Sequence, residues 1–323
     1  MSQASIAIVG AGLAGLACAS RLRAAGHAVR VFDKGRAPGG RMATRREENA
    51  AWDHGAQYFT VREPAFAALV ARASPAGEVA RWVPRWPGGE QESRELWVGT
   101  PGISALPRFL AQGLDVTQGT RIVSLARGGA GWILRDDRGA DHPGFDFVVL
   151  AVPAPQAAAL AAGHSGLAAR AGTVGMAPCW AVMVAFERPL EAPVDAGWED
   201  EPVLPWFARN SSKPRRSGLD AWVLHAGAEW SRERIETPAT VVQASLLERL
   251  AVKLGTALPP AASVAAHRWR HARVEAPVGE AFLLDRAAGL ACCGDWCLDA
   301  RVEAAFMSGD ALGGELAGGP GRL

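Results

Sequence analysis

Three glycines at a fixed spacing are the first residues of this 323-residue chain whose types alone indicate a chemistry. Gly10, Gly12 and Gly15 follow the apolar run at residues 6–9, and Asp33 ends the next apolar run. Gly10 permits a tight turn, Gly12 lets the backbone approach a pyrophosphate, and Gly15 allows a helix to pack closely on a strand. Amides at the start of that helix would bind phosphate, and Asp33 would accept hydrogen bonds from an adenosine ribose. The pattern predicts a dinucleotide site.

A second group of small and acidic residues lies near the C-terminus. Gly294 and Asp295 follow the apolar run at residues 290–293, and Val302 and Glu303 open a segment expected to be helical. A carboxylate can accept hydrogen bonds from ligand hydroxyls, and the amides at a helix N-terminus can face negative charge. Two motifs so far apart in the chain predict a long ligand that is held at both ends, and we expect a flavin.

The elements that must position these motifs suggest a cofactor domain interrupted by insertions. Helices are expected at residues 13–25, 64–73, 103–112 and 241–254, and strands at 6–9, 29–32, 81–85, 95–98, 182–186, 222–225 and 290–293, with a β-meander over 120–150. The last strand of that meander is apolar throughout, which is typical of a strand buried on both faces. An α/β fold follows from this order.

Composition narrows the possible classes of protein. Hydrophobic residues make up 49% of the chain, which is ample for a core, and the net charge of +1 gives no electrostatic case for nucleic acid or an anionic membrane. No apolar run approaches the roughly 18 to 20 residues of a membrane span, and the N-terminus does not resemble a signal peptide, so we expect a cytoplasmic protein. The five cysteines have no zinc-site spacing, and we expect no metal.

Further motifs accompany the two ends of the expected cofactor site. They lie at residues 39–41 (Gly-Gly-Arg), 53–60, 97–102, 210–214, 222–226, 229–231 and 268–272. Together with the end motifs they resemble the flavin amine-oxidase superfamily and, within it, the bacterial renalase-like enzymes. The resemblance covers essentially the whole chain.

This resemblance implies a fold and an activity. The fold would be a glutathione-reductase-like (Rossmann-type) FAD-binding α/β domain, formed by residues 1–78, 103–158 and 266–323, with a smaller substrate domain of β-sheet plus helices at 79–102 and 159–265. FAD would be bound noncovalently. The enzyme would oxidise the 2- or 6-dihydro isomers of NAD(P)H to NAD(P)+, and O2 would reoxidise the flavin and yield H2O2. This is a metabolite-repair reaction.

Residues are assigned to that site by motif. For FAD they are Gly10, Gly12, Leu13, Ala14, Gly15, Asp33, Lys34, Gly39, Gly40, Arg41, Met42, Gly55, Ala56, Val123, Ala151, Pro153, Gly294, Asp295, Val302 and Glu303. The resemblance implies that Asp295 meets a ribityl hydroxyl and that the amides at Val302 and Glu303 face the flavin N1/C2 carbonyl. For the substrate they are Gln57, Tyr58, Phe59, Thr60, Trp97, Val98, Gly99, Asn210, His225, Trp269 and Trp296. No catalytic acid or base is assigned, because removal of hydride from a dihydropyridine gives an aromatic cation directly and the flavin N5 accepts the hydride.

Two alternatives stay open at this point. The chain could be a flavin-dependent amine oxidase or a related desaturase; amine oxidases of the superfamily place a lysine near N5, and Lys213 is the lysine to consider. It could instead be a non-catalytic flavin or dinucleotide-binding protein. The preference for NAD or NADP, the ring isomer and the oligomeric state are also open.

Overall fold

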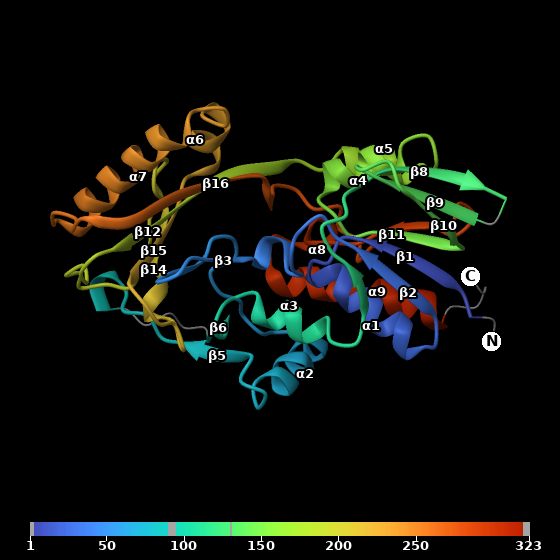
Figure 1. Ribbon diagram of the computed structural model, residues 1–323, viewed down its shortest axis with the longest axis horizontal. Coiled ribbons are helices and arrows are strands. Elements are labelled where there is room, and N and C mark those ends of the chain that lie inside the picture. The colour runs from blue at the N-terminus through green and yellow to red at the C-terminus, as the bar shows by residue number, and fades with distance from the viewer. Residues whose placement is uncertain (1–2, 90–94, 130, 319–323) are drawn as a thin grey trace.

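The computed structural model describes residues 3–89, 95–129 and 131–318, and Figure 1 shows it as two sheet-based halves side by side. The first half contains a six-stranded sheet with the order β17-β18-β11-β1-β2-β7. Its strands are β1 (Ser5–Val9), β2 (Ala28–Phe32), β7 (Asp115–Thr117), β11 (Phe147–Leu150), β17 (Leu283–Asp285) and β18 (Leu290–Cys292). All neighbouring strands are parallel except β17, which pairs antiparallel with β18 at the edge. The predicted Rossmann-like α/β fold is confirmed.

The central strands of this sheet are apolar throughout because both faces are covered. In β1, Ile6 and Ile8 belong to one core cluster and Ala7 and Val9 to the other. The first face is covered by α1 (Leu13–Ala24), α2 (Pro64–Ala73), α3 (Ala105–Leu110) and α9 (Val302–Gly318). The second face is covered by the antiparallel sheet of β8 (Ile122–Gly128), β9 (Gly131–Asp136) and β10 (Asp141–Phe145), with α4 (Ala154–Ala161) and α5 (Leu167–Gly172).

The second half contains an antiparallel five-stranded sheet with the order β13-β14-β15-β12-β16. Its strands are β12 (Met176–Phe186), β13 (Ala196–Trp198), β14 (Trp206–Arg209), β15 (Asp220–His225) and β16 (Ala261–Val274). Helix α7 (Ala239–Leu254) packs on its outer face through Val242, Leu246 and Leu250. Helix α6 (Ala228–Glu233) lies beside α7 in Figure 1, and β12 and β16 run toward the first half.

The remaining elements are short. They are η1 (Gly40–Met42), the pair β3 (Thr44–Arg46) and β4 (Ala51–Asp53), the pair β5 (Val79–Trp82) and β6 (Leu96–Gly99), η2 (Pro87–Gly89), η3 (Asn210–Ser212) and α8 (Asp295–Leu298). The helix predicted at residues 64–73 is confirmed at its predicted bounds. The 14-residue strand β16 was not predicted, because its Ala- and Arg-rich sequence is partly exposed along most of its length and lacks an apolar alternation.

Two of the expected domain boundaries fall inside elements. The boundary at 158/159 divides α4, and the boundary at 265/266 divides β16, which pairs with β12 as far as Val274. Helices α4 and α5 share a hydrophobic core cluster with β11 and therefore belong to the cofactor half of the molecule. We therefore propose that the substrate domain begins after α5 and includes all of β16.

Candidate functional site

The glycine turn between β1 and α1 leaves room for a ligand to approach its backbone. Gly10 has a φ of +111°, and a Cβ there would overlap the carbonyl of Ala151. A Cβ at Gly15 would overlap the carbonyl of Gly10, so this glycine is required by packing. At Gly12, by contrast, a Cβ would meet no heavy atom within 4 Å. The space at the N-terminus of α1 is therefore open at the position where a pyrophosphate is expected.

Asp33 is bound to the backbone around this turn. Its carboxylate accepts hydrogen bonds from the amides of Ala11 and Gly35, each at 2.6 Å. These bonds use two of its acceptor positions and leave others for a ribose. Lys34 beside it is exposed. Val123 lies at a register shift of β8, where no residue of β9 is paired with it, and its contact with adenine stays a prediction.

Arg41 joins the two ends of the predicted cofactor site. Its guanidinium makes a bidentate ion pair with Asp295, at 2.7 and 2.5 Å, and donates to the Ala272 carbonyl at 3.2 Å. Residues 41 and 295 are 254 positions apart in the chain. Gly39 and Gly40, before Arg41, have φ values of +141° and +55°, and a Cβ at Gly40 would lie 3.5 Å from the Gly12 Cα. The N-terminal and C-terminal motifs therefore meet in space.

Small residues let the 53–60 segment close against Arg41. The amide of Ala56 donates to the Arg41 carbonyl at 2.9 Å, and a Cβ at Gly55 would overlap that same carbonyl. The same Cβ would also lie 3.4 Å from the Trp269 ring. Gly55, Ala56, Arg41 and Trp269 thus form one continuous contact, as the sequence motifs suggest for a flat ring system.

A row of side chains on the inner face of the five-stranded sheet lies against this segment. Trp206 is directly opposite His225, His225 opposite Ala181, and Ala181 opposite His267, and directly opposed residues share one face. The ring of His54 contacts the His267 ring at 4.9 Å between centroids.

Trp269 and His225 are both anchored on residue 54. The ring of His54 stacks on Trp269 at 5.2 Å between centroids. The backbone carbonyl of His54 accepts from the Trp269 indole at 2.9 Å and lies 3.2 Å from His225 Nε2. Both predicted substrate residues are thereby brought to the 53–57 segment.

Polar side chains of the same segment take part in a buried ion cluster. Asp53 Oδ2 accepts from Arg216 at 2.6 Å and from Lys213 Nζ at 3.3 Å. Lys213 also donates to Asn210 at 3.0 Å and to Gln57 at 3.2 Å. The side chains of Asp53 and Lys213 have no exposed surface, and that of Arg216 is 2% exposed. Gln57, Asn210 and Lys213 are therefore part of a sealed network that joins the two halves.

This cluster shifts the pKa values of its members. The pKa of Lys213 is lowered to about 8, mainly by burial and further by the charge of Arg216. The charge of Asp53 opposes this shift. Burial alone would raise the pKa of Asp53, but the charges of Lys213 and Arg216 outweigh it and hold that pKa below its usual range. Asp53 is thus a carboxylate between two cations.

Several predicted site residues have structural positions instead. Trp296 is fully buried beneath β11, where its indole donates to the Val152 carbonyl at 3.0 Å, so it is not a wall of the substrate pocket. Phe59 is 2% exposed and packs edge-on against Phe66 in the first core cluster. Val98 is fully buried, and a Cβ at Gly99 would meet backbone atoms of the 102–103 turn. The predictions for Trp296, Phe59 and Val98 were wrong because these apolar motif residues fill cores, and the role of Gly99 stays a prediction.

The side chain of Glu303 has a structural role. Its carboxylate accepts from the backbone amides of Arg62 and Glu63, at 2.7 and 2.8 Å, and is 2% exposed. The side chain therefore binds the start of α2, and only the backbone of Glu303 stays available at the N-terminus of α9. Val302 begins α9 as expected.

The other predicted residues lie at or beside the site. Tyr58 contacts Trp82 and Trp206 at 6.4 and 5.7 Å between ring centroids. Trp97 exchanges backbone hydrogen bonds with Phe59, and Thr60 is partly buried. Leu13, Ala14 and Met42 are buried beside the glycine turn, Gly294 donates to Ser308, and Pro153 is the N-cap of α4.

His54, His267 and Arg216 were missed from the sequence. His54 stands inside the 53–60 motif and could have been found by its place there. His267 and Trp269 alternate along β16, but that signal needs the strand to be known. Arg216 had no signal, because only the fold brings it to Asp53.

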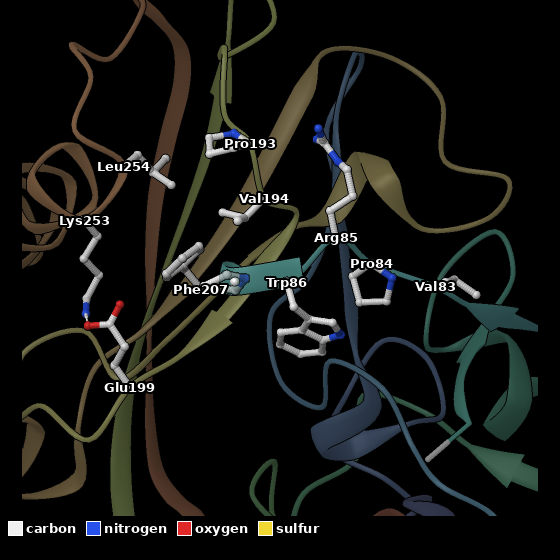
Figure 2. A pocket seen from close by; sticks show the side chains of 12 residues that line it. Val83, Pro84, Arg85, Trp86, Pro193, Val194, Glu199, Phe207, Lys253 and Leu254 are labelled. Carbon is white, nitrogen blue, oxygen red and sulfur yellow. Dashed lines mark hydrogen bonds and ion pairs between the residues drawn. The ribbon is translucent and has the colours of Figure 1, made fainter. Parts of the chain in front are cut away.

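A separate hollow of about 680 Å³ lies at the edge of the five-stranded sheet (Figure 2). Trp86, Phe207 and Leu254 form apolar walls, and Lys253 lies beside Glu199. None of the predicted site residues lines it. This hollow is therefore distinct from the candidate site.

Two histidines, His54 and His225, are expected to make the protein sensitive to acid. Burial lowers the pKa of His54 and of His225 to about 4, from an ordinary value of 6.5. Between pH 6.5 and pH 4 these histidines are protonated in the unfolded chain but neutral in the folded chain. The free energy of unfolding therefore falls as the pH drops from 6.5 toward 4. The slope is about 1.4 kcal/mol per pH unit for each histidine. Denaturant unfolding across this range should show a smaller slope in His54→Asn; an unchanged slope would contradict the assignment.

Comparison with solved structures agrees with this fold. The proposed protoporphyrinogen oxidase of Exiguobacterium sp. 255-15 superposes with a TM-score of 0.79 at 14% identity, over 98% of this chain and 99% of that one. Cyclohexylamine oxidase from Brevibacterium oxydans IH-35A gives 0.74 at 12% identity, over 98% and 99%. Putrescine oxidase bound to putrescine gives 0.70 at 15% identity, over 97% and 99%. At these identities the likeness shows the fold alone.

Sequence comparison adds a local match to a curated protein and matches to two family models. A 4,4'-diapophytoene desaturase (4,4'-diaponeurosporene-forming) of Staphylococcus haemolyticus is 48% identical over 50 residues. These residues are 16% of this chain and 10% of that protein. In the described residues, no helix is both long and apolar enough to cross a membrane. Residues 8–73 match an NAD(P)-binding Rossmann-like domain, and residues 87–311, more than half of the chain, match the flavin containing amine oxidoreductase family. The chain belongs to this family, and its cofactor is FAD.

Proposed function

We propose that this protein is an oxidase that removes a hydride from the 2- or 6-dihydro isomers of NAD(P)H and gives NAD(P)+. Bound FAD would supply the two-electron chemistry: it would accept the hydride, and O2 together with one proton from solvent would reoxidise it and leave as H2O2. The observation that carries the proposal is that Lys213 is held by hydrogen bonds inside a buried ion cluster. No proton acceptor is required for this reaction, since loss of hydride makes the nicotinamide ring aromatic.

The residues present fit FAD along its whole length. The pyrophosphate would lie at the open space beside Gly12, and the adenosine ribose at Asp33. Arg41 and Asp295 would hold the phosphate and ribityl groups, which carry the complementary donors and acceptors. The flat ring would lie beside the backbone of Gly55 and Ala56, which packs on the Arg41 carbonyl and the Trp269 ring.

The three lysines of the chain argue against amine oxidation. Lys213 donates to three acceptors in the buried cluster. Lys34 is exposed beside Asp33, and Lys253 pairs with Glu199 and Glu201 at the separate hollow. None of them is placed as the lysine that the superfamily's amine oxidases use near N5. Protonated amines would also be repelled by the two cations of the cluster.

The chain's own residues would bind and orient the dihydronicotinamide ring. Tyr58 and Trp269 offer aromatic faces at the 53–58 segment. His225, which is neutral at physiological pH because of its lowered pKa, offers a hydrogen bond to a carboxamide. For hydride removal the protein has to stack the ring in place and exclude water.

Aerobic turnover tests the proposal. The FAD-loaded enzyme is mixed with the 2- and 6-dihydro isomers and, separately, with cyclohexylamine and putrescine. We expect NAD(P)+ and H2O2 in equal amounts from an isomer and no turnover of either amine. Turnover of the amines without turnover of the isomers would replace this function by amine oxidation. Absence of turnover with both sets would favour a binding protein.

A further inference from the structure

The ion cluster between the two halves contains more positive than negative charge. Lys213 and Arg216 both bind the same oxygen of Asp53. The other oxygen of that carboxylate accepts from the Ile103 amide at 2.8 Å and from Thr44 at 2.9 Å. One carboxylate therefore faces two cations, and the group carries a net charge of +1 when Lys213 is protonated.

Nothing polar and neutral in the cluster cancels this charge. Asn210 and Gln57 present oxygens to Lys213, which satisfies its hydrogens but leaves the charge. The Nε of Arg216 is buried and has no hydrogen-bond partner among the described residues.

A chain of hydrogen bonds links this charge to the predicted flavin surface. Lys213 Nζ donates to Gln57 Oε1, and Gln57 Nε2 donates to the Gly55 carbonyl at 3.1 Å. Gly55 packs on the Arg41 carbonyl, to which the next residue, Ala56, donates its amide. The cation is thus one side chain away from the backbone on which the flavin ring would lie.

We propose that Lys213 is a positioning residue whose buried positive charge favours reduced over oxidised FAD and so makes the bound flavin a stronger oxidant. The inference rests on the proposed placement of FAD at Gly55 and Ala56. Reduction adds negative charge to the ring, and a buried cation stabilises that charge. For charges roughly 10 Å apart at an effective dielectric constant of about 20, the preference is about tenfold.

The charge of Lys213 depends on pH, which gives a second observable. Burial lowers the pKa of Lys213 to about 8, with a further contribution from Arg216 and an opposing one from Asp53; His225 is the other titratable neighbour. Below that pH the cation is present, and above it the cation is lost. Because linkage is reciprocal, reduction of the flavin raises the pKa of Lys213, and the potential falls more steeply with pH in the interval just above 8.

Redox titration of the FAD-loaded protein with a chemical reductant tests this directly. In Lys213→Met the remaining Asp53–Arg216 pair is balanced, so the variant should fold. We expect its midpoint potential to fall by about 30 mV, which corresponds to a tenfold change for a two-electron couple. Lys213→Arg should retain the wild-type potential. Lys253→Met is the matched control, because that lysine side chain is also buried (3% exposed) but lies at the separate hollow.

The outcomes separate this inference from the proposed function. A potential in Lys213→Met equal to that of the wild type, with or without a change in thermal stability, would reduce Lys213 to a structural residue and overturn the inference. If the variant fails to fold, the wild-type potential is measured from pH 6 to 10, and a uniform slope overturns it. No nicotinamide dinucleotide is present in these titrations, so a shifted potential would stand even if the dihydronicotinamide isomers proved not to be substrates.

Discussion

Replacing Asp53 by asparagine is expected to lower the free energy of unfolding by about 3–5 kcal/mol. The side chain of Asp53 has no exposed surface and is the carboxylate that both Lys213 and Arg216 contact. Asparagine keeps the shape but leaves two cations facing each other in a buried site. Because the cluster joins the two halves of the molecule, the loss should affect the whole fold. Denaturant unfolding with FAD at a fixed saturating concentration measures it.

Two further variants complete this experiment. Asp141→Asn removes a carboxylate that pairs with Arg135 in an exposed position, and it should cost no more than about 1 kcal/mol. Adding Lys213→Met to Asp53→Asn removes one of the stranded cations and should restore part of the stability. A loss below about 1 kcal/mol in Asp53→Asn would mean that the cluster is not charged as described.

Gly12→Val should abolish FAD binding while the protein stays folded. The backbone of Gly12 is extended, with φ −75° and ψ 176°, which valine adopts, and its Cβ would meet no heavy atom within 4 Å. The added side chain would instead fill the space proposed for the pyrophosphate. We expect the affinity for FAD to fall by at least about 100-fold, or about 2.7 kcal/mol. Fluorescence titration of the apoprotein with FAD gives the dissociation constant.

Two other glycines give matched controls for this variant. Gly166 is also an N-cap with open surroundings, so Gly166→Val should leave FAD binding unchanged. Gly15→Val should prevent folding, since its Cβ would overlap the Gly10 carbonyl. If Gly12→Val bound FAD as tightly as the wild type, the phosphate site would have to lie elsewhere.

The cofactor half of the fold could be predicted because its signals are local. Gly10, Gly12 and Gly15 define a turn within six residues, and the apolar runs of β1 and β11 indicate burial on both faces. The pairing of Arg41 with Asp295 was only implied, because both were assigned to one ligand without any signal that they touch. The family and its FAD followed from these motifs.

The substrate half was harder to predict because its site is built from long-range contacts. Lys213 and Asp53 are 160 residues apart, and each looks unremarkable in its own segment. The row from Trp206 to His267 exists only in the register of four strands, one of which, β16, has no clear apolar pattern. Phe59 and Trp296 were placed at the substrate because aromatic residues in a motif cannot be told from core residues without the fold.

Anaerobic mixing of the FAD-loaded enzyme with a dihydronicotinamide dinucleotide isomer is the most direct test of the proposed reaction. The visible absorbance of the oxidised flavin is followed by stopped flow, with the 2-dihydro isomer, the 6-dihydro isomer, cyclohexylamine and putrescine in parallel. We expect rapid bleaching by at least one isomer, with one NAD(P)+ formed per flavin, and none by the amines. Rapid bleaching by an amine, with none by either isomer, would contradict the proposed function.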